Sequence, residues 1–284
     1  LKKNLGFAKG YNKGLKFIKS TYYILLNNDV RVTKNWIPPL IKGLKQNNVA
    51  GCQPKILSDR NSSFFEHAGA CGGFIDKDFF PFCRGRIFDS VEKDKQQYNH
   101  ELDVFWVSGA AFAIKAEIFN KVKGFDESFF AHMEEIDLCW RLQAMGYDIW
   151  VEPNSVIFHK NAVSLPMHTH RKYYLNHRNS LLMLFSNYSI LNAFYFGMIR
   201  LMLEFVALGY AFMKIDFKHA SGILRSFIWL ISHPFVILNK RKRFKLIRKL
   251  KDKEILKKFC KTPIVLAHFI FRKKTYLDIV SKAD

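Results

Sequence analysis

The chain has 284 residues, of which 49% are hydrophobic, so it can bury a large core, and disorder is excluded as its main state. It has 45 Lys and Arg against 24 Asp and Glu, a formal net charge of +21. This charge is uneven: residues 1–165 hold 22 basic and 18 acidic side chains, and residues 166–284 hold 23 and 6. The first part has the balance of an ordinary globular domain. The second has the balance of a region that meets an anionic surface.

The 5 cysteines include no CxxC pair, which argues against a disulfide framework and a zinc ribbon and favours a reducing compartment. His67, Cys71 and Cys83 are spaced too loosely for a convincing metal site, and buried or incidental side chains are the better interpretation.

The first part of the chain alternates between predicted helices and strands. A short helix is expected at 14–20, and the apolar run "TYYILLNNDV" at 21–30 predicts a buried strand that runs into a polar loop. Residues 36–46 predict a helix with prolines in its first turn, and residues 49–57 predict another strand. This order predicts an α/β sheet covered on both faces.

The middle of the chain returns to the same pattern after an interruption. Residues 58–104 are expected to be irregular, as an insertion or substrate loop. Residues 103–122 predict a strand and a helix, and residues 124–159 predict a loop, a helix that ends before Gly146, and a strand that ends near His159.

Beyond residue 170 the pattern changes to long helical stretches at 173–189, 191–214 and 221–240. None offers about 20 uninterrupted apolar residues, because Arg200, Glu204 and Arg225 intervene. Contact with a membrane surface, or a re-entrant segment, is therefore expected in preference to a clean span.

A basic amphipathic helix is predicted over "KRKRFKLIRKLKDKEILKKF", residues 240–259. A solvated helical face and nucleic-acid binding are the alternatives. Anionic lipid headgroups are favoured, because basic residues that follow apolar helices are attracted to an anionic membrane leaflet.

Polar residues end two of the predicted strands. Asn27, Asn28 and Asp29 follow the first strand, where α/β proteins bind ligands, and a carboxylate there suits a hard divalent cation. Asn and Asp are also common turn formers. His159, at the end of a later strand, has the same ambiguity between a metal ligand and a residue that is only hydrogen-bonded in place.

Three carboxylates lie within four positions of "AHMEEIDLCWRL", residues 131–142. Carboxylates in a first helical turn stabilise the helix dipole, which is the structural explanation. On a helix Glu134 and Asp137 share one side, whereas Glu135 points about 100° away. The cluster is therefore divided between two environments, and one carboxylate can face a cleft as a general base.

These motifs in this order resemble the family 2 inverting glycosyltransferases of the GT-A fold, in particular the rhamnosyltransferase-like branch. The resemblance is carried by the asparagine-glycine opening, the strand that ends in "NND", "SGAAFAIKAEIF", "KGFDESFF", the acidic helix start and the histidine followed five residues later by Ser164. It runs from Asn4 to about Ser164 and continues loosely into residues 172–189. In that family two further strands precede the position of Leu1, so we expect the chain to lack its N-terminal strands.

The resemblance implies a metal site for Mg²⁺ or Mn²⁺. It gives Asp29 the metal role of a DXD-like motif and places Asn27 and Asn28 at its variable, donor-binding positions. His159 matches the histidine that completes the metal site. Residues expected to bind the nucleotide sugar are Asn4, Gly6, Asn12, Gly14, Ser108, Gly109 and Ala110.

Glu135 matches the catalytic base, where the family usually has aspartate, and Glu134 matches the acid before it, near the donor. The implied reaction moves a sugar from a nucleotide-diphosphate sugar to a glycan or lipid-linked acceptor with inversion, in bacterial surface polysaccharide synthesis. The expected location is the cytoplasmic face of the inner membrane, peripheral or re-entrant, with no nucleic-acid partner. The alternative is a non-catalytic basic protein that binds membranes or nucleic acid.

The expected fold class is α/β: a GT-A-like, Rossmann-like mixed sheet flanked by helices and followed by a helical, membrane-associated region. The domain boundary is expected near residue 165, with a glycosyltransferase domain at 1–165 and the basic helical region at 166–284.

Overall fold

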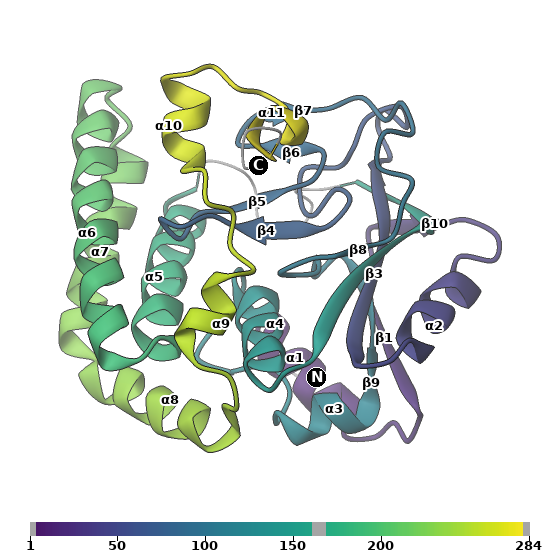
Figure 1. Cartoon of the computed structure of the whole chain (residues 1–284). Coiled ribbons are helices and arrows are strands. Elements are labelled where there is room, and N and C mark those ends of the chain that lie inside the picture. Colours follow the sequence, from purple (N-terminus) through teal and green to yellow (C-terminus); the bar gives the residue numbers. More distant parts are fainter. Residues whose placement is uncertain (1–3, 161–168, 281–284) are drawn as a thin grey trace. The chain divides into compact units, whose positions relative to one another are not determined.

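The computed structural model describes residues 4–160 and 169–280 (Figure 1). The chain forms two compact units that interleave in the sequence. We call them the helical unit, Leu1–Ile18, Gly124–Arg141 and Ala162–Arg248, and the sheet unit, Lys19–Lys123, Leu142–Asn161 and Lys249–Asp284. Position 165 lies outside the described residues, and the predicted division there stays a prediction.

The main sheet of the sheet unit has the strand order β1-β9-β3-β10-β2, and β8 pairs with β10. Strands β1, β3 and β10 run in one direction, whereas β9 and β2 run antiparallel to their neighbours. The predicted mixed sheet is therefore confirmed. The strands are β1 (Tyr22–Leu26), β2 (Val30–Val32), β3 (Val49–Ser58), β8 (Leu102–Asp103), β9 (Ala111–Lys115) and β10 (Asp148–His159).

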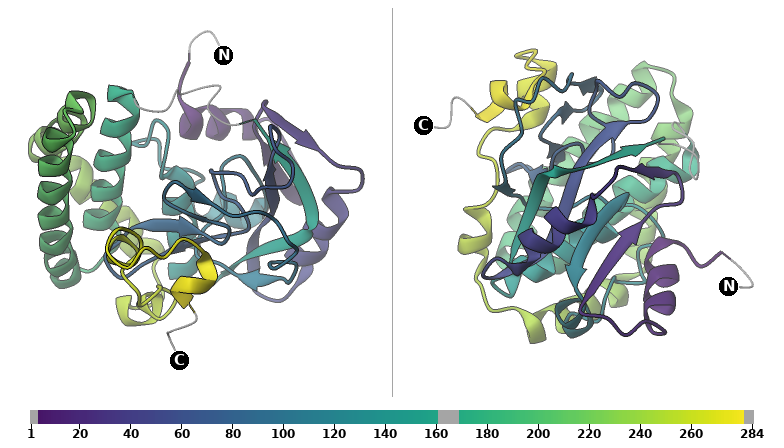
Figure 2. Two further views of the ribbon diagram at one scale, coloured as in Figure 1. Left: turned by 90° about the horizontal axis from the view of Figure 1, so that it is seen from above. Right: turned by 90° about the vertical axis from the view of Figure 1, so that its right-hand side faces the viewer.

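Helix α2 (Ile37–Lys45) covers one face of this sheet, as the right-hand view of Figure 2 shows. Its buried Leu40 and Leu44 pack with Val49 and Ile56 of β3 and with Ile157 of β10. A second helix, α3 (Ala116–Lys121), follows β9 directly. The prolines at the start of α2 cost no intrahelical hydrogen bond, because the first-turn N–H groups have no partner within the helix.

The directions of the strands bring several loops to one edge of the sheet. Because β1, β3 and β10 are codirectional, their carboxyl ends lie at the same edge. Asn27 N also donates to Ala110 O at 2.9 Å, which joins the loop after β1 to the residues before β9. This edge is where α/β sheets bind ligands.

Residues 58–104 are more ordered than predicted. They include a four-stranded sheet with the order β4-β5-β6-β7 that packs with the C-terminal helices. The strands have only two or three residues each, too few for a periodic pattern to show. The elements are β4 (Gly73–Ile75), β5 (Pro81–Cys83), β6 (Arg86–Ile87), β7 (Ser90–Val91), α9 (Asp252–Leu256), α10 (Ile264–Phe269) and α11 (Tyr276–Val280).

In the helical unit, α5 packs against α6, α7 and α8, and Figure 2 shows α5–α7 side by side. The predicted helix at 14–20 is wrong, since α1 ends at Leu15. The predicted helices at 221–240 and 240–259 are divided differently, because α8 begins at Pro234 and ends at Ile247. The helices are α1 (Phe7–Leu15), α4 (Glu134–Ala144), α5 (His170–Asn187), α6 (Ile190–Met213), α7 (Phe217–Ser232) and α8 (Pro234–Ile247).

Within the described residues one helix, α6, is long and apolar enough to cross a membrane, with a mean hydropathy of 1.5. Helices α7 and α8 pass the same test only as a pair, bent by 72° at their junction. Both findings concern length and composition alone.

Candidate functional site

One group of candidate residues lies at the ligand-binding edge of the main sheet. Asp29 stands in the tight connection between β1 and β2, and His159 is the last residue of β10. His159 Nε2 lies 3.2 Å from Asp29 Oδ1, so the two residues predicted as metal ligands are brought together.

Glu66 is a third member of this group that the sequence did not reveal. Its Oε2 lies 3.3 Å from His159 Nδ1, and its side chain is 2% exposed. Burial lowers the pKa of His159, but the carboxylates of Glu66 and Asp29 more than offset this and raise the pKa above its usual value. The imidazole is therefore held between two carboxylates.

The donor atoms at this edge fit a divalent cation with few protein ligands. No cluster of three or more His, Cys, Asp or Glu side chains placed to hold a metal occurs within residues 4–160 and 169–280. Asp29 and His159 nevertheless offer a carboxylate oxygen and an imidazole nitrogen close together, and Oε1 of buried Glu66 has no hydrogen-bond partner. Mg²⁺ commonly takes one or two protein carboxylates and completes its shell with water and phosphate oxygens.

Ser108, Gly109 and Ala110 reach the same edge through the contact between Asn27 and Ala110. The Ser108 hydroxyl donates to Ala68 O, and its Oγ accepts from Ala110 N at 3.1 Å. Since Ser108 is only 2% exposed, its side chain shapes the loop. Its role in donor binding stays a prediction.

A second group of candidates lies in the helical unit, at the start of α4. Glu134 is buried and Glu135 half-buried, and one oxygen of each, Oε2, has no hydrogen-bond partner. Burial raises the pKa of Glu135 to about 7. Burial, the nearby Glu135 and then Asp137 raise the pKa of Glu134 well above its usual range. Such a pair readily holds a proton near neutral pH.

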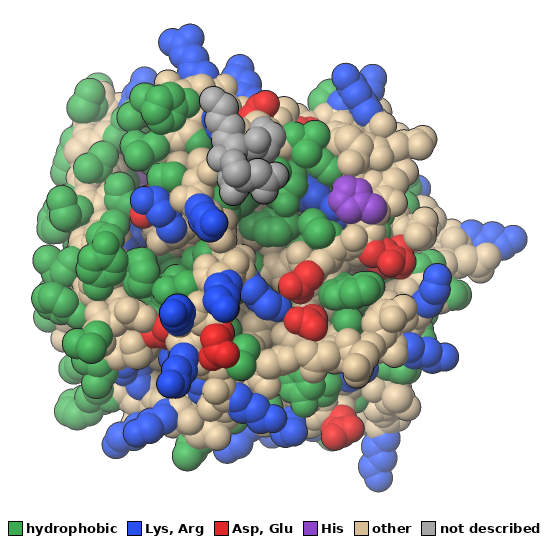
Figure 3. Space-filling model, viewed as in Figure 1, with side chains coloured by type: hydrophobic (Ala, Val, Ile, Leu, Met, Phe, Trp, Pro, Cys, Tyr) green, Lys and Arg blue, Asp and Glu red, His purple; other side chains and the backbone are tan. Residues whose placement is uncertain are grey.

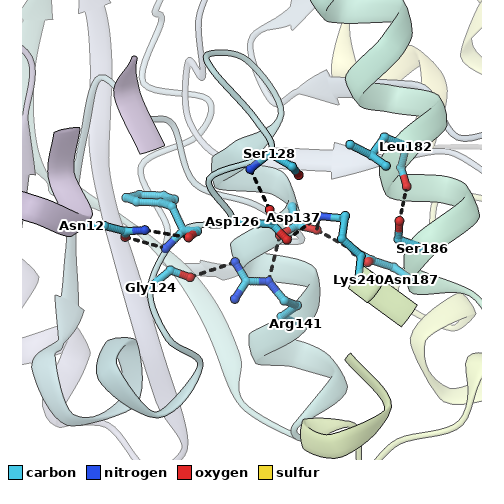
Figure 4. A network of polar contacts seen from close by, with 11 residues as sticks. Asn12, Gly124, Asp126, Ser128, Asp137, Arg141, Leu182, Ser186, Asn187 and Lys240 are labelled. Carbon is cyan, nitrogen blue, oxygen red and sulfur yellow. Dashed lines mark hydrogen bonds and ion pairs between the residues drawn. The ribbon is translucent and has the colours of Figure 1, made fainter. Parts of the chain in front are cut away.

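Asp137, the third carboxylate of this helix start, is fully occupied by structural contacts (Figure 4). Its Oδ2 accepts from Arg141 Nε at 2.8 Å, and its Oδ1 accepts from Asn187 Nδ2 at 3.2 Å and faces Lys240 Nζ at 3.4 Å. Lys240 Nζ also lies 2.9 Å from Asp126 Oδ2. Asp137 therefore ties α4, α5 and α8 together, as its buried position requires.

The residues expected to approach the donor from the N-terminal side hold the loop before α4. Asn12 Nδ2 donates to Phe125 O at 2.8 Å, and Asn12 Oδ1 accepts from Phe125 N at 2.9 Å. Asn4 Oδ1 accepts a hydrogen bond from Gly6 N. Gly6 has a positive φ of 79°, and a Cβ at this position would clash with Phe130 O, so the position favours glycine. Gly14 has open space around its Cα, so no packing contact explains its glycine.

Asn179 is the second residue that sequence reasoning missed. Its Nδ2 donates to Ala131 O at 2.9 Å and to His132 O at 2.7 Å, and its side chain is fully buried. His132 and Met133 both have positive φ, at 69° and 71°, immediately before α4. Non-glycine residues in this conformation persist only where the surroundings impose it, and Asn179 supplies part of that constraint.

His132 adds a further unpartnered atom to this loop. Its Nε2 is buried without a hydrogen-bond partner. Burial, and then the charge of Lys172, lower the pKa of His132 to about 4, so the ring is neutral at neutral pH. Unpaired buried polar atoms are costly, and they are found where a ligand completes a site.

The family assignment comes from a family model described as "Glycosyl transferase family 2", which matches residues 1–122. This segment belongs to glycosyl transferase family 2. The resemblance predicted from the sequence is thus confirmed. Asp29 and Ser108–Ala110 lie inside the family 2 segment, whereas Glu135 and His159 lie beyond it.

Curated proteins similar to this chain include two rhamnosyltransferases. The N-acetylglucosaminyl-diphospho-decaprenol L-rhamnosyltransferase of Mycobacterium tuberculosis is 26% identical over 144 residues, which are 49% of this chain and 47% of the relative. Rhamnosyltransferase WbbL of Escherichia coli is 24% identical over 176 residues, 60% of this chain and 64% of the relative. The matches therefore span about half to just under two thirds of these relatives.

Among solved structures, GalNAc-T7 with UDP, GalNAc and Mn²⁺ superposes with a TM-score of 0.48 and 14% identity. The match covers 66% of this chain and 35% of that chain.

Proposed function

We propose that this protein transfers a sugar from a nucleotide-diphosphate sugar to a hydroxyl group of a glycan or lipid-linked acceptor, with inversion at the anomeric carbon. The relatives named as rhamnosyltransferases favour a rhamnosyl or related hexosyl donor. The proposed role is in bacterial surface polysaccharide synthesis. The expected place of work is the cytoplasmic face of the inner membrane. The family 2 segment supports the reaction class. The observation that supports general-base catalysis is the raised pKa of Glu135 together with its unpartnered Oε2.

Glu135 is proposed as the general base. A base must be deprotonated for part of its time near the operating pH and must have an oxygen available for the proton. The pKa of about 7 and the unpartnered Oε2 meet both conditions. Glu135 takes the acceptor proton, the acceptor oxygen forms a bond to the anomeric carbon, and the bond from that carbon to the nucleotide diphosphate breaks. General-base catalysis of this kind contributes about 10²- to 10⁴-fold.

Asp29 and His159 are proposed to hold Mg²⁺ or Mn²⁺, with Glu66 orienting the imidazole from its other side. When bound, the ion would stabilise the negative charge on the departing diphosphate. Asn4, Gly6, Asn12, Gly14, Asn27, Asn28, Ser108, Gly109, Ala110 and Glu134 remain the proposed donor-binding residues.

A nucleotide-release assay tests the proposal. Purified protein is incubated with a panel of nucleoside-diphosphate sugars, with Mn²⁺ or with EDTA, and the released nucleoside diphosphate is measured. We expect manganese-dependent release that falls at least about 100-fold in Asp29→Ala. Absence of release with every donor would favour the non-catalytic binding protein instead.

The base is tested with Glu135→Gln and a matched control, Glu117→Gln. Glu117 is an exposed carboxylate in the first turn of α3, so its change alters the charge of a helix start without touching the candidate site. Glu135→Gln is expected to abolish transfer to an acceptor while donor affinity survives, and the control to keep both. Retained turnover in Glu135→Gln would rule out this base.

A further inference from the structure

The charged residues of α6 point inward. Arg200 and Glu204, the only charged residues between 190 and 213, are 5% and 2% exposed. Arg200 Nη2 lies 2.9 Å from Glu204 Oε1, and His177 of α5 contacts the other oxygen of Glu204. The charges of α6 are therefore paired with each other and with the neighbouring helix.

The outer face of α6 is apolar along its whole length. Leu191, Tyr195, Met198, Met202 and Phe205 recur at the spacing of one helical face, and each is between 49% and 83% exposed. Hydrophobic side chains gather over α6 and α7 in the space-filling view (Figure 3). The exposed hydrophobic residues of α6 are Ile190, Leu191, Phe194, Tyr195, Met198, Met202, Phe205, Val206, Tyr210, Phe212 and Met213.

This polarity is the reverse of a water-exposed helix. A surface helix in water directs its charges outward and its apolar stripe to the core. Helices in contact with lipid do the opposite, since their few charged residues face the bundle interior and pair there. A continuous apolar face of this length is also larger than the scattered hydrophobic residues of an ordinary protein surface.

The exposed charges around this face are all of one sign. Within residues 190–248, all of which the structure describes, every charged side chain that is exposed is basic. The two acidic residues of this stretch are occupied, Glu204 by Arg200 and Asp216 by Tyr173 and the N–H of His219. The exposed basic residues are Lys214, Lys218, Arg225, Lys242, Arg243 and Lys245.

We propose that the outer face of α6 contacts the acyl region of an anionic bilayer, with the basic residues of α7 and α8 at the lipid headgroups. The apolar face suits hydrocarbon, and each Lys or Arg near an anionic leaflet adds electrostatic attraction. A second copy of the chain would also cover an apolar face, but self-association gains nothing from a surface that carries only positive charge. The inference rests on the proposed membrane location and is independent of the transfer reaction.

Vesicle flotation with the full chain tests this surface. The vesicles are phosphatidylcholine alone or phosphatidylcholine with phosphatidylglycerol. The test variant is Met202→Glu with Phe205→Glu, two exposed positions on the outer face. The control is Phe17→Glu with Phe271→Glu, which adds the same charge at two exposed positions outside α6.

We expect the wild type and the control to float with the anionic vesicles, and the α6 variant to lose at least about tenfold in partitioning. Circular dichroism of each variant verifies the fold. Equal flotation of both double variants would overturn the proposal. The proposal would also be overturned if the wild type did not float and light scattering showed a dimer without lipid that the double substitution Met202→Glu with Phe205→Glu dissociates. Nucleotide release in solution is measured separately, so failure of the transferase proposal leaves this test intact.

Discussion

Lys240→Met tests how strongly the buried polar network of the helical unit stabilises the fold. Lys240 is 5% exposed, and its ammonium faces both Asp126 and Asp137. Methionine keeps most of the apolar side chain, including its place near the ring of Phe129, and removes only the charge. The variant therefore leaves two buried or nearly buried carboxylates with one cation fewer.

The magnitude follows from what each carboxylate keeps. Removing one partner from a buried ion pair costs about 3–5 kcal/mol when the other charge is left alone. Asp137 keeps Arg141 and Asn187, and Asp126 keeps the N–H of Ser128. Because both carboxylates keep partners, we expect a smaller loss, about 2–3 kcal/mol in the free energy of unfolding.

The effect of pH has a definite sign. Burial would raise the pKa of Asp126, but Lys240 and then Ser128 lower it below its usual range. A carboxylate with a depressed pKa contributes stability that is present above its unfolded value of about 3.9 and is lost as pH falls through its folded value. The difference between wild type and Lys240→Met should thus be largest near neutral pH and shrink below about pH 4.

Urea denaturation followed by far-UV circular dichroism measures this difference. Lys242→Met is the matched control, because Lys242 is exposed on the same helix, and its loss should change stability by less than about 0.5 kcal/mol. Equal losses in the two variants would refute the reasoning. So would a Lys240→Met deficit that stays constant from neutral to acid pH.

Three other predictions concern separate parts of the molecule. Asn179→Ala removes two hydrogen bonds to the loop before α4. We expect the free energy of unfolding, measured by urea denaturation, to fall by about 1–3 kcal/mol, and transfer to slow at unchanged donor affinity. Unaltered kinetics would show that the loop does not position Glu135. The transfer rate of the wild type should rise as pH passes about 7, since Glu135 must lose its proton, and a flat pH profile would contradict this. In thiol labelling of the native protein, the half-buried Cys260 should react first, because Cys52, Cys71, Cys83 and Cys139 are buried; early labelling of Cys52 would contradict the structure.

The local sequence was sufficient where the element carries its own signals. The strand predicted within 21–30 is β1, and the strand predicted at 49–57 is β3, within one residue at its end. Both have apolar runs bounded by polar residues. Helix α2 was likewise predictable from the prolines in its first turn. Pro234 also marks a helix start, that of α8. The prediction of one helix over 221–240 did not take this proline into account.

Other elements depend on residues far away in the sequence. Helix α1 begins after Gly6, whose backbone lies against Phe130 of a loop more than a hundred positions later. The small sheet of β4–β7 is built from strands too short to show alternation, and it is covered by helices from the end of the chain. No local pattern contains that information, so these elements were misplaced or missed.

The candidate site divides in the same way. Residue types at strand ends left Asp29 and His159 ambiguous, and the family resemblance gave them the predicted metal role; the sheet brings them within 3.2 Å. Glu66 and Asn179 were not proposed. Glu66 stands in no motif, Asn179 lies in a segment of only loose resemblance, and each acts through a contact with a distant part of the chain. Their roles follow from tertiary contacts alone.

The three carboxylates at the start of α4 show why proximity in sequence does not set chemical state. Asp137 is surrounded by Arg141, Asn187 and Lys240, drawn from three helices, and every charge it carries is matched. Glu135, two positions earlier and on another side of the helix, has no such partner for its Oε2, and burial raises its pKa. Electrostatic stabilisation of the helix start would be served equally by either residue. The presence of cationic partners beside Asp137 and their absence at Glu135 Oε2 therefore distinguish a structural carboxylate from one able to exchange a proton. Lys240→Met and Glu135→Gln test the two roles independently.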